Sequence, residues 1–184
     1  MDYTLRLATL DDVSLLEELI ARSIRGLGAA DYTNAQIEAA LQRAFGVDTV
    51  LIRDGTYFIA ETRTREVVAC GGWSRRRTLF GSDARAERDE SWLNPSSEPA
   101  KIRAFFVDPS HARRGIGRAI LARSESEAIR AGFSSFEMMA TLPGMRLYEQ
   151  CGYVADPAID YPLPDGLTIR FVPMHKRAHP APRA

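Results

Sequence analysis

The sequence predicts a mixed α/β (α+β) domain built on one central sheet. Strand-like alternation of apolar and polar side chains takes turns with helical periodicity along the chain, which is typical of this class. The 184 residues, of which 45% are hydrophobic, suffice for one substantial core. No internal repeat or low-complexity tract points to another architecture. We expect a sheet of about six or seven strands flanked by about four helices, with a single domain over residues 1–177 and a flexible tail over 178–184.

The chain begins with a short strand and two helices. Residues 3–7 alternate as a strand does. Two capping-box signatures then predict helix starts, Thr9 with Asp12 and Thr33 with Gln36. Apolar residues follow each signature at helical spacing, and Gly46 predicts the end of the second helix.

Three strands are predicted next. The first two, 57–62 and 67–74, are joined by the polar residues 63–66, which predicts a hairpin. The third, 102–107, follows a stretch rich in Ser, Asp, Glu and Pro over 81–99. This stretch has little periodicity, so we expect a long surface loop, and loops of this length often carry function.

A helix, a strand and a short helix follow. The helix covers 115–131 and is stopped by Gly132, and alternation over 133–141 predicts the strand. Pro143 then opens a short helix that Gly152 closes.

Two strands, 153–155 and 167–174, complete the predicted order. The segment between them contains Tyr161, Pro162 and Pro164 and is expected to be a loop. It either connects the strands or covers a binding site.

Composition excludes several classes of function. The 24 basic and 24 acidic residues leave no net charge to attract nucleic acid or an anionic membrane. No apolar run reaches the roughly 18 residues that span a bilayer, and the first residues do not resemble a secretory signal, so we expect a cytoplasmic protein. Cys70 and Cys151 lack metal-ligand spacing and are expected to be reduced packing residues, with no metal site. A homodimer is compatible with exposed strand edges.

The segment that carries chemistry follows the strand at 102–107. Gly115 and Gly117 mark a turn that runs directly into a helix. The first backbone N–H groups of a helix have no intrahelical partner, and together with the helix dipole they bind anions. Glycines at these positions let phosphate oxygens approach the backbone. The segment therefore predicts a site for a diphosphate.

Two common phosphate loops do not fit this segment. A dinucleotide fingerprint needs Gly or Ala where Ile120 stands, and it needs an acidic residue about 20 positions later. A triphosphate loop needs Gly, four residues, Gly, Lys and then Ser or Thr, a pattern that the chain lacks.

A third pattern fits better. Phe105-Phe106-Val107-Asp108-Pro109, followed by Arg113-Arg114-Gly115-Ile116-Gly117-Arg118, resembles the acetyl-CoA-binding segment of the GNAT superfamily of N-acetyltransferases. Leu147-Tyr148-Glu149-Gln150-Cys151-Gly152-Tyr153 resembles a later helix motif of that family, and the order of elements matches over nearly the whole chain. Two differences are Ala112, where the family usually has Gln or Arg, and the absence from 138–141 of an Asn that many members carry.

The resemblance implies a GNAT-like fold and acetyl-CoA as cosubstrate. It pairs the backbone of Phe106 and Val107 with the pantetheine arm, includes Phe105 among the cofactor-binding residues, and places Tyr148 beside the sulfur. The residues whose amides it assigns to the pyrophosphate are Arg113, Arg114, Gly115, Ile116, Gly117 and Arg118. The activity it implies is acetyl transfer to a primary amine by direct attack, with a small-molecule amine favoured.

Alternatives stay open at this point. The chain could instead bind acyl-CoA without catalysis, or acetylate a peptide or protein amine. Tyr148 is our candidate for the acid that protonates the leaving thiolate, and its alternative role is aromatic packing. No base is assigned among Glu61, Asp83, Glu98, His111 and Glu137.

Two further features have ordinary explanations beside functional ones. Arg75, Arg76 and Arg77 either meet an anionic ligand or form a solvated strand end. Trp73 lines the acceptor pocket or packs in the core.

Overall fold

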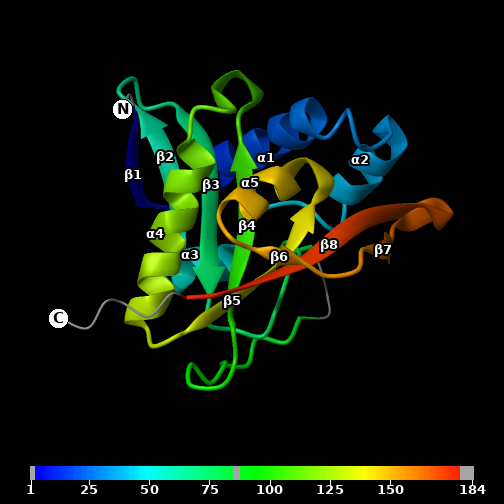
Figure 1. Cartoon of the computed structure of the whole chain (residues 1–184). Coiled ribbons are helices and arrows are strands. Elements are labelled where there is room, and N and C mark those ends of the chain that lie inside the picture. The colour runs from blue at the N-terminus through cyan, green and yellow to red at the C-terminus, as the bar shows by residue number, and fades with distance from the viewer. Residues whose placement is uncertain (1–2, 85–87, 179–184) are drawn as a thin grey trace.

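The computed structural model describes residues 3–84 and 88–178, and it places one sheet between two layers of helices (Figure 1). The mixed α/β class and the GNAT-like order of elements are confirmed. The element count is somewhat higher than expected, at eight strands and five α-helices in the described residues.

The N-terminal region contains β1 (Tyr3–Leu7), α1 (Val13–Leu27), α2 (Asn34–Leu41) and α3 (Thr49–Arg53). Both predicted capping boxes are present, at the short 3₁₀ turn that leads into α1 and at the start of α2. The second helix ends before Gly46, and α3 was not predicted because five residues give too little periodicity to detect.

The strands that follow are β2 (Tyr57–Thr62), β3 (Val67–Ser74), β4 (Ala100–Val107), β5 (Ser135–Thr141), β6 (Val154–Ala155), β7 (Ile159–Pro162) and β8 (Thr168–Arg177). Their order in the sheet is β1-β2-β3-β4-β5-β8-β6, and β7 pairs with β8. The segment around Tyr161 is therefore a strand where a loop was expected. Its antiparallel pairing with β8 provides backbone partners that its own sequence does not reveal.

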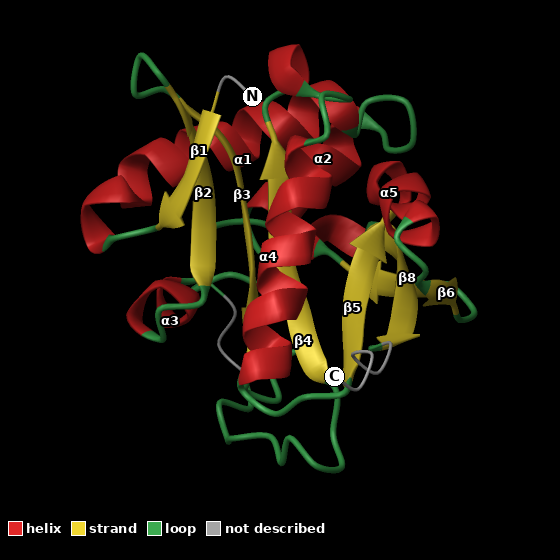
Figure 2. Ribbon diagram, turned by 60° about the vertical axis from the view of Figure 1, so that its left-hand side comes forward, coloured by secondary structure: helices red, strands yellow, loops and turns green. Residues whose placement is uncertain are grey.

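Helices cover both faces of the sheet, and each face has its own core. Helix α4 (Ile116–Arg130) packs on β2, β3 and β4, and the short α5 (Met145–Gln150) lies on the same side. Helices α1 and α2 cover the opposite face (Figure 2). Leu16, Ile37 and Phe171 belong to the core beneath α1 and α2, whereas Ile120 and Phe136 belong to the core beneath α4.

The sheet opens at its centre. The parallel strands β4 and β5 pair only at Ala100 with Phe136 and at Lys101 with Glu137. Further along, β4 contains a bulge, because Ala104 has a φ of 57° and the register with β3 shifts between Cys70 and Gly72. The two strands therefore diverge toward their C-terminal ends, and this divergence creates space in the middle of the sheet.

Three expectations concern the rest of the chain. The tail predicted over 178–184 lies outside the described residues from 179 onward. Within the part of the chain that is described, no helix is long and apolar enough to cross a membrane. Cys70 and Cys151 are both free thiols, and Cys70 is fully buried.

Candidate active site

A cleft of about 580 Å³ runs between the C-terminal half of α1, the end of β4, the start of α4 and helix α5. Nine of the ten residues predicted for the site line it, namely Phe105, Phe106, Val107, Arg113, Gly115, Ile116, Gly117, Arg118 and Tyr148. The tenth, Arg114, is exposed and is not among the lining residues.

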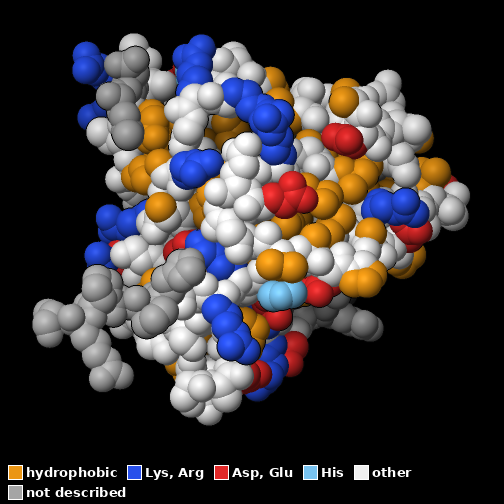
Figure 3. Space-filling view, viewed as in Figure 1, with side chains coloured by type: hydrophobic (Ala, Val, Ile, Leu, Met, Phe, Trp, Pro, Cys, Tyr) orange, Lys and Arg blue, Asp and Glu red, His pale blue; other side chains and the backbone are white. Residues whose placement is uncertain are grey.

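The end of the cleft that the sequence predicts to bind a diphosphate is built by the backbone. Arg113 and Gly115 both have left-handed φ values, 64° and 81°, directly before the first turn of α4. Such alternation makes successive N–H groups converge on one point, and the N-terminus of a 15-residue helix adds its dipole. Figure 3 shows Lys and Arg side chains over this part of the molecule. The arrangement suits a diphosphate.

The two glycines serve different purposes. A Cβ at Gly115 would meet no atom within 4 Å, so its glycine is required by φ and not by space. A Cβ at Gly117 would lie 3.1 Å from Leu147 Cδ2. Gly117 therefore allows α4 and α5 to approach closely, rather than only clearing space for a ligand as the sequence suggested.

Helix α1 is fastened to the end of β4 and forms one wall of the cleft. Arg22 Nε lies 3.1 Å from Asp108 Oδ2, and Val107 N–H donates to Ser23 Oγ at 3.1 Å. At Gly26 a Cβ would come within 2.4 Å of Pro109 Cγ, so only glycine permits this approach. A pantetheine arm that pairs with the Val107 amide must share or replace the bond to Ser23.

A second, smaller cavity of about 70 Å³ lies between β4, β5 and the loop around Phe80, where Phe45 and Phe171 of the core beneath α1 and α2 line it. It shares four lining residues with the cleft, which are Phe105, Phe106, Thr141 and Tyr148. The two cavities therefore meet where β4 and β5 diverge. Two molecules bound in the two cavities would come together at this point.

Tyr148 stands at the junction. Its ring packs edge-on against Phe105 at a centroid separation of 6.2 Å, and the residue is only 7% exposed. Burial raises the pKa of the Tyr148 phenol well above its ordinary value, so the hydroxyl stays protonated at neutral pH. Gly71 makes room for this packing, because a Cβ there would lie within 2.8 Å of the Phe105 ring.

Two buried tyrosines that the sequence did not indicate hold this geometry. Tyr57 donates to the carbonyl of Ala104 at 2.9 Å and so fixes the bulge of β4. Tyr32 donates to Arg170 O at 2.9 Å and accepts from Leu142 N–H at 2.8 Å. Their partners lie between 47 and 138 residues away along the chain, beyond the reach of local patterns.

The candidate bases are mostly neutralised elsewhere. Each carboxylate forms an ion pair, as Glu61 with Arg6, Asp83 with Arg88, Glu98 with Arg77 and Glu137 with Lys101. None of them lines either cavity. His111 and Asp31 line the larger cleft, and Asp31 was not singled out in the sequence.

The other candidate residues have structural places. Trp73 is buried in the core beneath α4, edge-on to Phe133, and lines neither cavity. The guanidinium of Arg75 lies over the Trp73 ring, while Arg76 pairs with Asp54. Tyr161 packs edge-on against Phe80 and so supports the wall of the smaller cavity.

A metal site was not expected. Among residues 3–84 and 88–178, no group of three or more His, Cys, Asp or Glu side chains is arranged to hold a metal ion.

Comparison with known proteins places this geometry in context. Residues 19–153 match the family model described as the acetyltransferase (GNAT) family. No curated protein matches the chain. Among solved structures, a GCN5-related N-acetyltransferase from Rhodopseudomonas palustris superposes with a TM-score of 0.70 at 18% identity, covering 96% of each chain.

Two further solved structures were determined with a ligand. YncA from Salmonella typhimurium, which holds acetyl-CoA, has a TM-score of 0.62 at 17% identity and covers 100% of this chain and 99% of its own. The PaiA N-acetyltransferase from Thermoplasma acidophilum, in complex with coenzyme A, has a TM-score of 0.63 at 13% identity and covers 96% of this chain and 99% of its own. At these identities the likeness establishes the fold.

Proposed function

The chain belongs to the acetyltransferase (GNAT) family, and from this premise we propose that it transfers the acetyl group of acetyl-CoA to the primary amine of a small molecule by direct attack. The observation that carries the proposal is the meeting of the two cavities beside Tyr148. The larger cleft would hold the thioester carrier and the smaller cavity the amine. A binding module without catalysis would have no need of the second cavity.

The larger cleft fits the carrier in its chemistry. The converging N–H groups from Arg113 to Arg118 would bind the diphosphate, and the guanidinium groups of that segment add positive charge. The end of β4 would receive the pantetheine arm. Acetyl-CoA, when bound, supplies an activated thioester at the junction.

The reaction forms one C–N bond and breaks one C–S bond. The amine nitrogen attacks the acetyl carbon, the amine loses a proton, and the leaving sulfur gains one, which yields an amide and free CoA. A lysine-like amine with a pKa near 10.4 must first be deprotonated, which costs about 4.6 kcal/mol at pH 7. Neither cavity is lined by Cys70 or Cys151, which supports direct attack over a thiol intermediate.

Tyr148 would stabilise the departing sulfur. The phenol lies at the junction and stays protonated, so it can donate a hydrogen bond to the developing thiolate and supply its proton. The raised pKa makes complete proton transfer harder than for an exposed tyrosine. Its main effect is therefore hydrogen bonding to the sulfur as negative charge develops there.

The test is release of free thiol from acetyl-CoA in the presence of an amine panel. The panel contains small amines, a peptide with a free amino terminus and a peptide with an internal lysine, and mass spectrometry identifies the product. We expect thiol release and an acetylated product with small amines, and intersecting initial-velocity lines as for a ternary complex. Tight CoA binding without thiol release from any amine would instead identify a sensor, and a preference for peptides would identify a protein acetyltransferase.

A further inference from the structure

The smaller cavity carries information about the acceptor, because its lining is chemically uneven. Most of the wall is apolar and aromatic, with Phe45, Phe80 and Phe171 contributing rings. Of the described residues that line it, only Arg103 and Tyr148 are ionisable, and none is a carboxylate. A cavity for a polyamine or another polycation needs acidic side chains to balance the additional ammonium groups. This cavity offers one cation instead.

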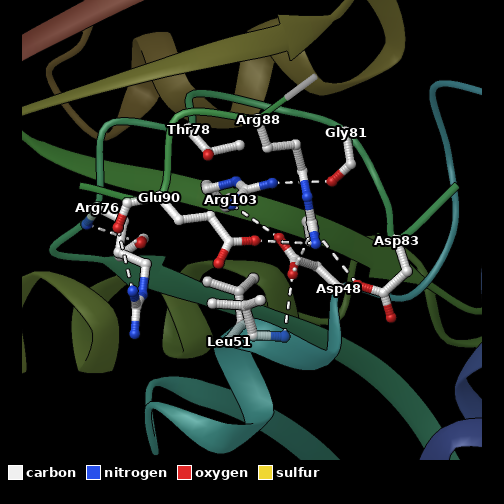
Figure 4. Close-up of polar contacts among 12 residues, drawn as sticks. Asp48, Leu51, Arg76, Thr78, Gly81, Asp83, Arg88, Glu90 and Arg103 are labelled. Atoms are coloured by element: carbon white, nitrogen blue, oxygen red, sulfur yellow. Dashed lines mark hydrogen bonds and ion pairs between the residues drawn. The ribbon is translucent and has the colours of Figure 1, made fainter. Parts of the chain in front are cut away.

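Arg103 is placed with unused hydrogen-bonding capacity. Its side chain is 3% exposed, Nη1 lies 2.7 Å from Asp48 Oδ2, and Nη2 donates to the carbonyl of Gly81 at 2.8 Å. Nε is buried and has no hydrogen-bond partner. A guanidinium carries five N–H donors in a planar fork that matches a carboxylate. Figure 4 shows Arg103 reaching from β4 toward Asp48 and Gly81.

The charge around Arg103 is only partly compensated within the protein. Asp48 is fully buried and also pairs with Arg88 at 3.0 Å, so one buried carboxylate serves two guanidinium groups (Figure 4). Arg88 has two further partners, Asp83 and Glu90, but their side chains are 40% and 44% exposed and therefore screened by water. Burial lowers the pKa of Arg103, which reflects the free-energy cost of keeping this charge in a dry place.

A neighbouring cation provides a comparison. Lys101 is also buried and lies two residues before Arg103 on the same face of β4, but it has its own carboxylate partner, Glu137. It does not line the cavity. Arg103, the cation that lines the cavity, is thus the one whose carboxylate partner, Asp48, also pairs with another guanidinium.

We propose that the amine acceptor carries a carboxylate and that Arg103 anchors this carboxylate in the smaller cavity. The acceptor is then a compact amino acid with an apolar side chain, and this inference rests on the proposed acetyl transfer. Arg103 and Tyr148 line the same cavity, so a carboxylate held at Arg103 leaves the amine free to face the junction at Tyr148. The volume of about 70 Å³ corresponds to about five water-sized positions, which is comparable to the five non-hydrogen atoms of an α-amino acid core.

The first test uses the unmodified protein with matched acceptors. L-Alanine and L-valine are compared with their amides, which keep the skeleton and remove only the negative charge, and spermidine represents a polycation. Thiol release from acetyl-CoA gives kcat/KM for each. We expect at least a tenfold higher kcat/KM for each amino acid than for its amide. Equal values, or a preference for the amides or spermidine, would overturn the assignment of a carboxylate.

The second test changes the anchor. Arg103→Met should raise KM for the amino acids at least tenfold, leave KM for the amides nearly unchanged, and preserve the dissociation constant of CoA. For the amino acids, the KM of Arg103→Lys should lie between those of the unmodified protein and Arg103→Met, because lysine keeps the charge but lacks the planar fork. Arg77→Met is the control, since Arg77 is exposed, pairs with Glu98 and lines neither cavity.

The outcomes separate this inference from the proposed function. Equal losses on acids and amides in Arg103→Met would overturn the anchoring role of Arg103. If that variant does not fold, the comparison of acids with amides on the unmodified protein decides the question. Failure of every amine to release thiol would overturn acetyl transfer itself, whereas release with amides alone overturns only the carboxylate.

Discussion

Single residues in this protein acquire their chemistry from burial. Tyr148 has the sequence context of a proton donor, but its position between Phe105 and Tyr153 removes it from water and raises its pKa. Arg103 shows the same principle with a positively charged group, since its buried guanidinium shares Asp48 with Arg88. In both cases the residue type sets which chemical group is present, and burial and neighbouring charges set the pKa of that group.

The role of Tyr148 can be tested by removing its hydroxyl. Tyr148→Phe keeps the aromatic packing and should lower kcat by about 10-fold to 10⁴-fold, with an unchanged dissociation constant for CoA. Because burial raises the pKa of this phenol, the pH profile of the unmodified enzyme should show no loss of activity from its ionisation at neutral or moderately alkaline pH. Steady-state kinetics over this range provide the measurement, and an unaltered kcat in the variant removes the residue from the mechanism.

At the scale of elements, the joint between β4 and α4 decides the shape of the cleft. Its left-handed residues turn the chain so that the first amides of α4 face the space between α1 and α5. The hydrogen bond from Val107 to Ser23 and the ion pair of Arg22 with Asp108 hold α1 against this joint. The turn proposed to bind the diphosphate, Arg113 to Gly115 with the first amides of α4, is therefore shaped by backbone conformation. It is stabilised by α1, a helix near the N-terminus.

Backbone strain at Gly115 should weaken CoA binding. Gly115→Ala introduces a Cβ into open space at a φ of 81°, so its destabilisation comes from conformation alone and should be about 1–2 kcal/mol. Gly166→Ala is a matched control, because Gly166 has a φ of 71°, also has open space around it and lies outside both cavities. Urea unfolding should show similar losses for both variants. Calorimetry should show weaker CoA binding, by about tenfold, for Gly115→Ala only. Equal CoA affinities of the two variants would contradict binding of the diphosphate at this turn.

The ion pair of Arg6 with Asp12, between β1 and α1, should make the free energy of unfolding depend on pH. The hydrogen bonds from Arg6 are the main cause that lowers the pKa of Asp12 to about 2 from an ordinary 3.8. A depressed carboxylate pKa stabilises the fold above the unfolded value, so this contribution is complete above about pH 5 and is lost as pH falls toward about 2. It amounts to about 2 kcal/mol at neutral pH.

Asp12→Asn should reproduce that loss at pH 7. The free energy of unfolding should drop by about 2 kcal/mol, and the gap between variant and unmodified protein should narrow at pH 3. Urea unfolding followed by circular dichroism at pH 7, 5 and 3 measures this difference in the free energy of unfolding. Asp11→Asn serves as control, since Asp11 is exposed and should change stability little at any pH. A gap that stays constant between pH 7 and pH 3 would contradict the linkage.

At the scale of the whole molecule, the cleft and the smaller cavity meet at one point in the sheet. Each face of the sheet has its own core, and the divergence of β4 from β5 leaves the junction of the two cavities between these cores. A binding event in the cleft contacts α1, β4, α4 and α5 together, so it should stabilise the entire fold.

This coupling predicts a thermal shift. CoA at about 100 times its dissociation constant should add about 2.7 kcal/mol to the free energy of unfolding. For a chain of 184 residues this raises Tm by about 5–11 °C. Adenosine at the same concentration lacks the diphosphate and should shift Tm far less. Differential scanning fluorimetry provides the comparison, and similar shifts with both compounds would show that the diphosphate contributes little.

How much the sequence could predict depended on the range of the interactions. Helix starts at Thr9 and Thr33 were predictable because a capping box involves residues three apart. Helix α3 and strand β7 were not, because one is a single short turn and the other exists through pairing with β8. The residues predicted for the cleft lie in one stretch, 105–118, apart from Tyr148, and nine of the ten line it. The wall formed by α1 was not predicted, because α1 lies far from this stretch in the sequence.

By itself the sequence determined the class of fold, the family and the backbone segment proposed to hold the carrier, because each is encoded in periodicity or in a short local motif. Only the tertiary structure decided the smaller cavity, the sharing of Asp48 between Arg88 and Arg103, and the bond from Tyr57 that fixes the bulge. Those features join positions that lie tens of residues apart in the chain. Their physical content is burial and distance, which arise only when the chain has folded.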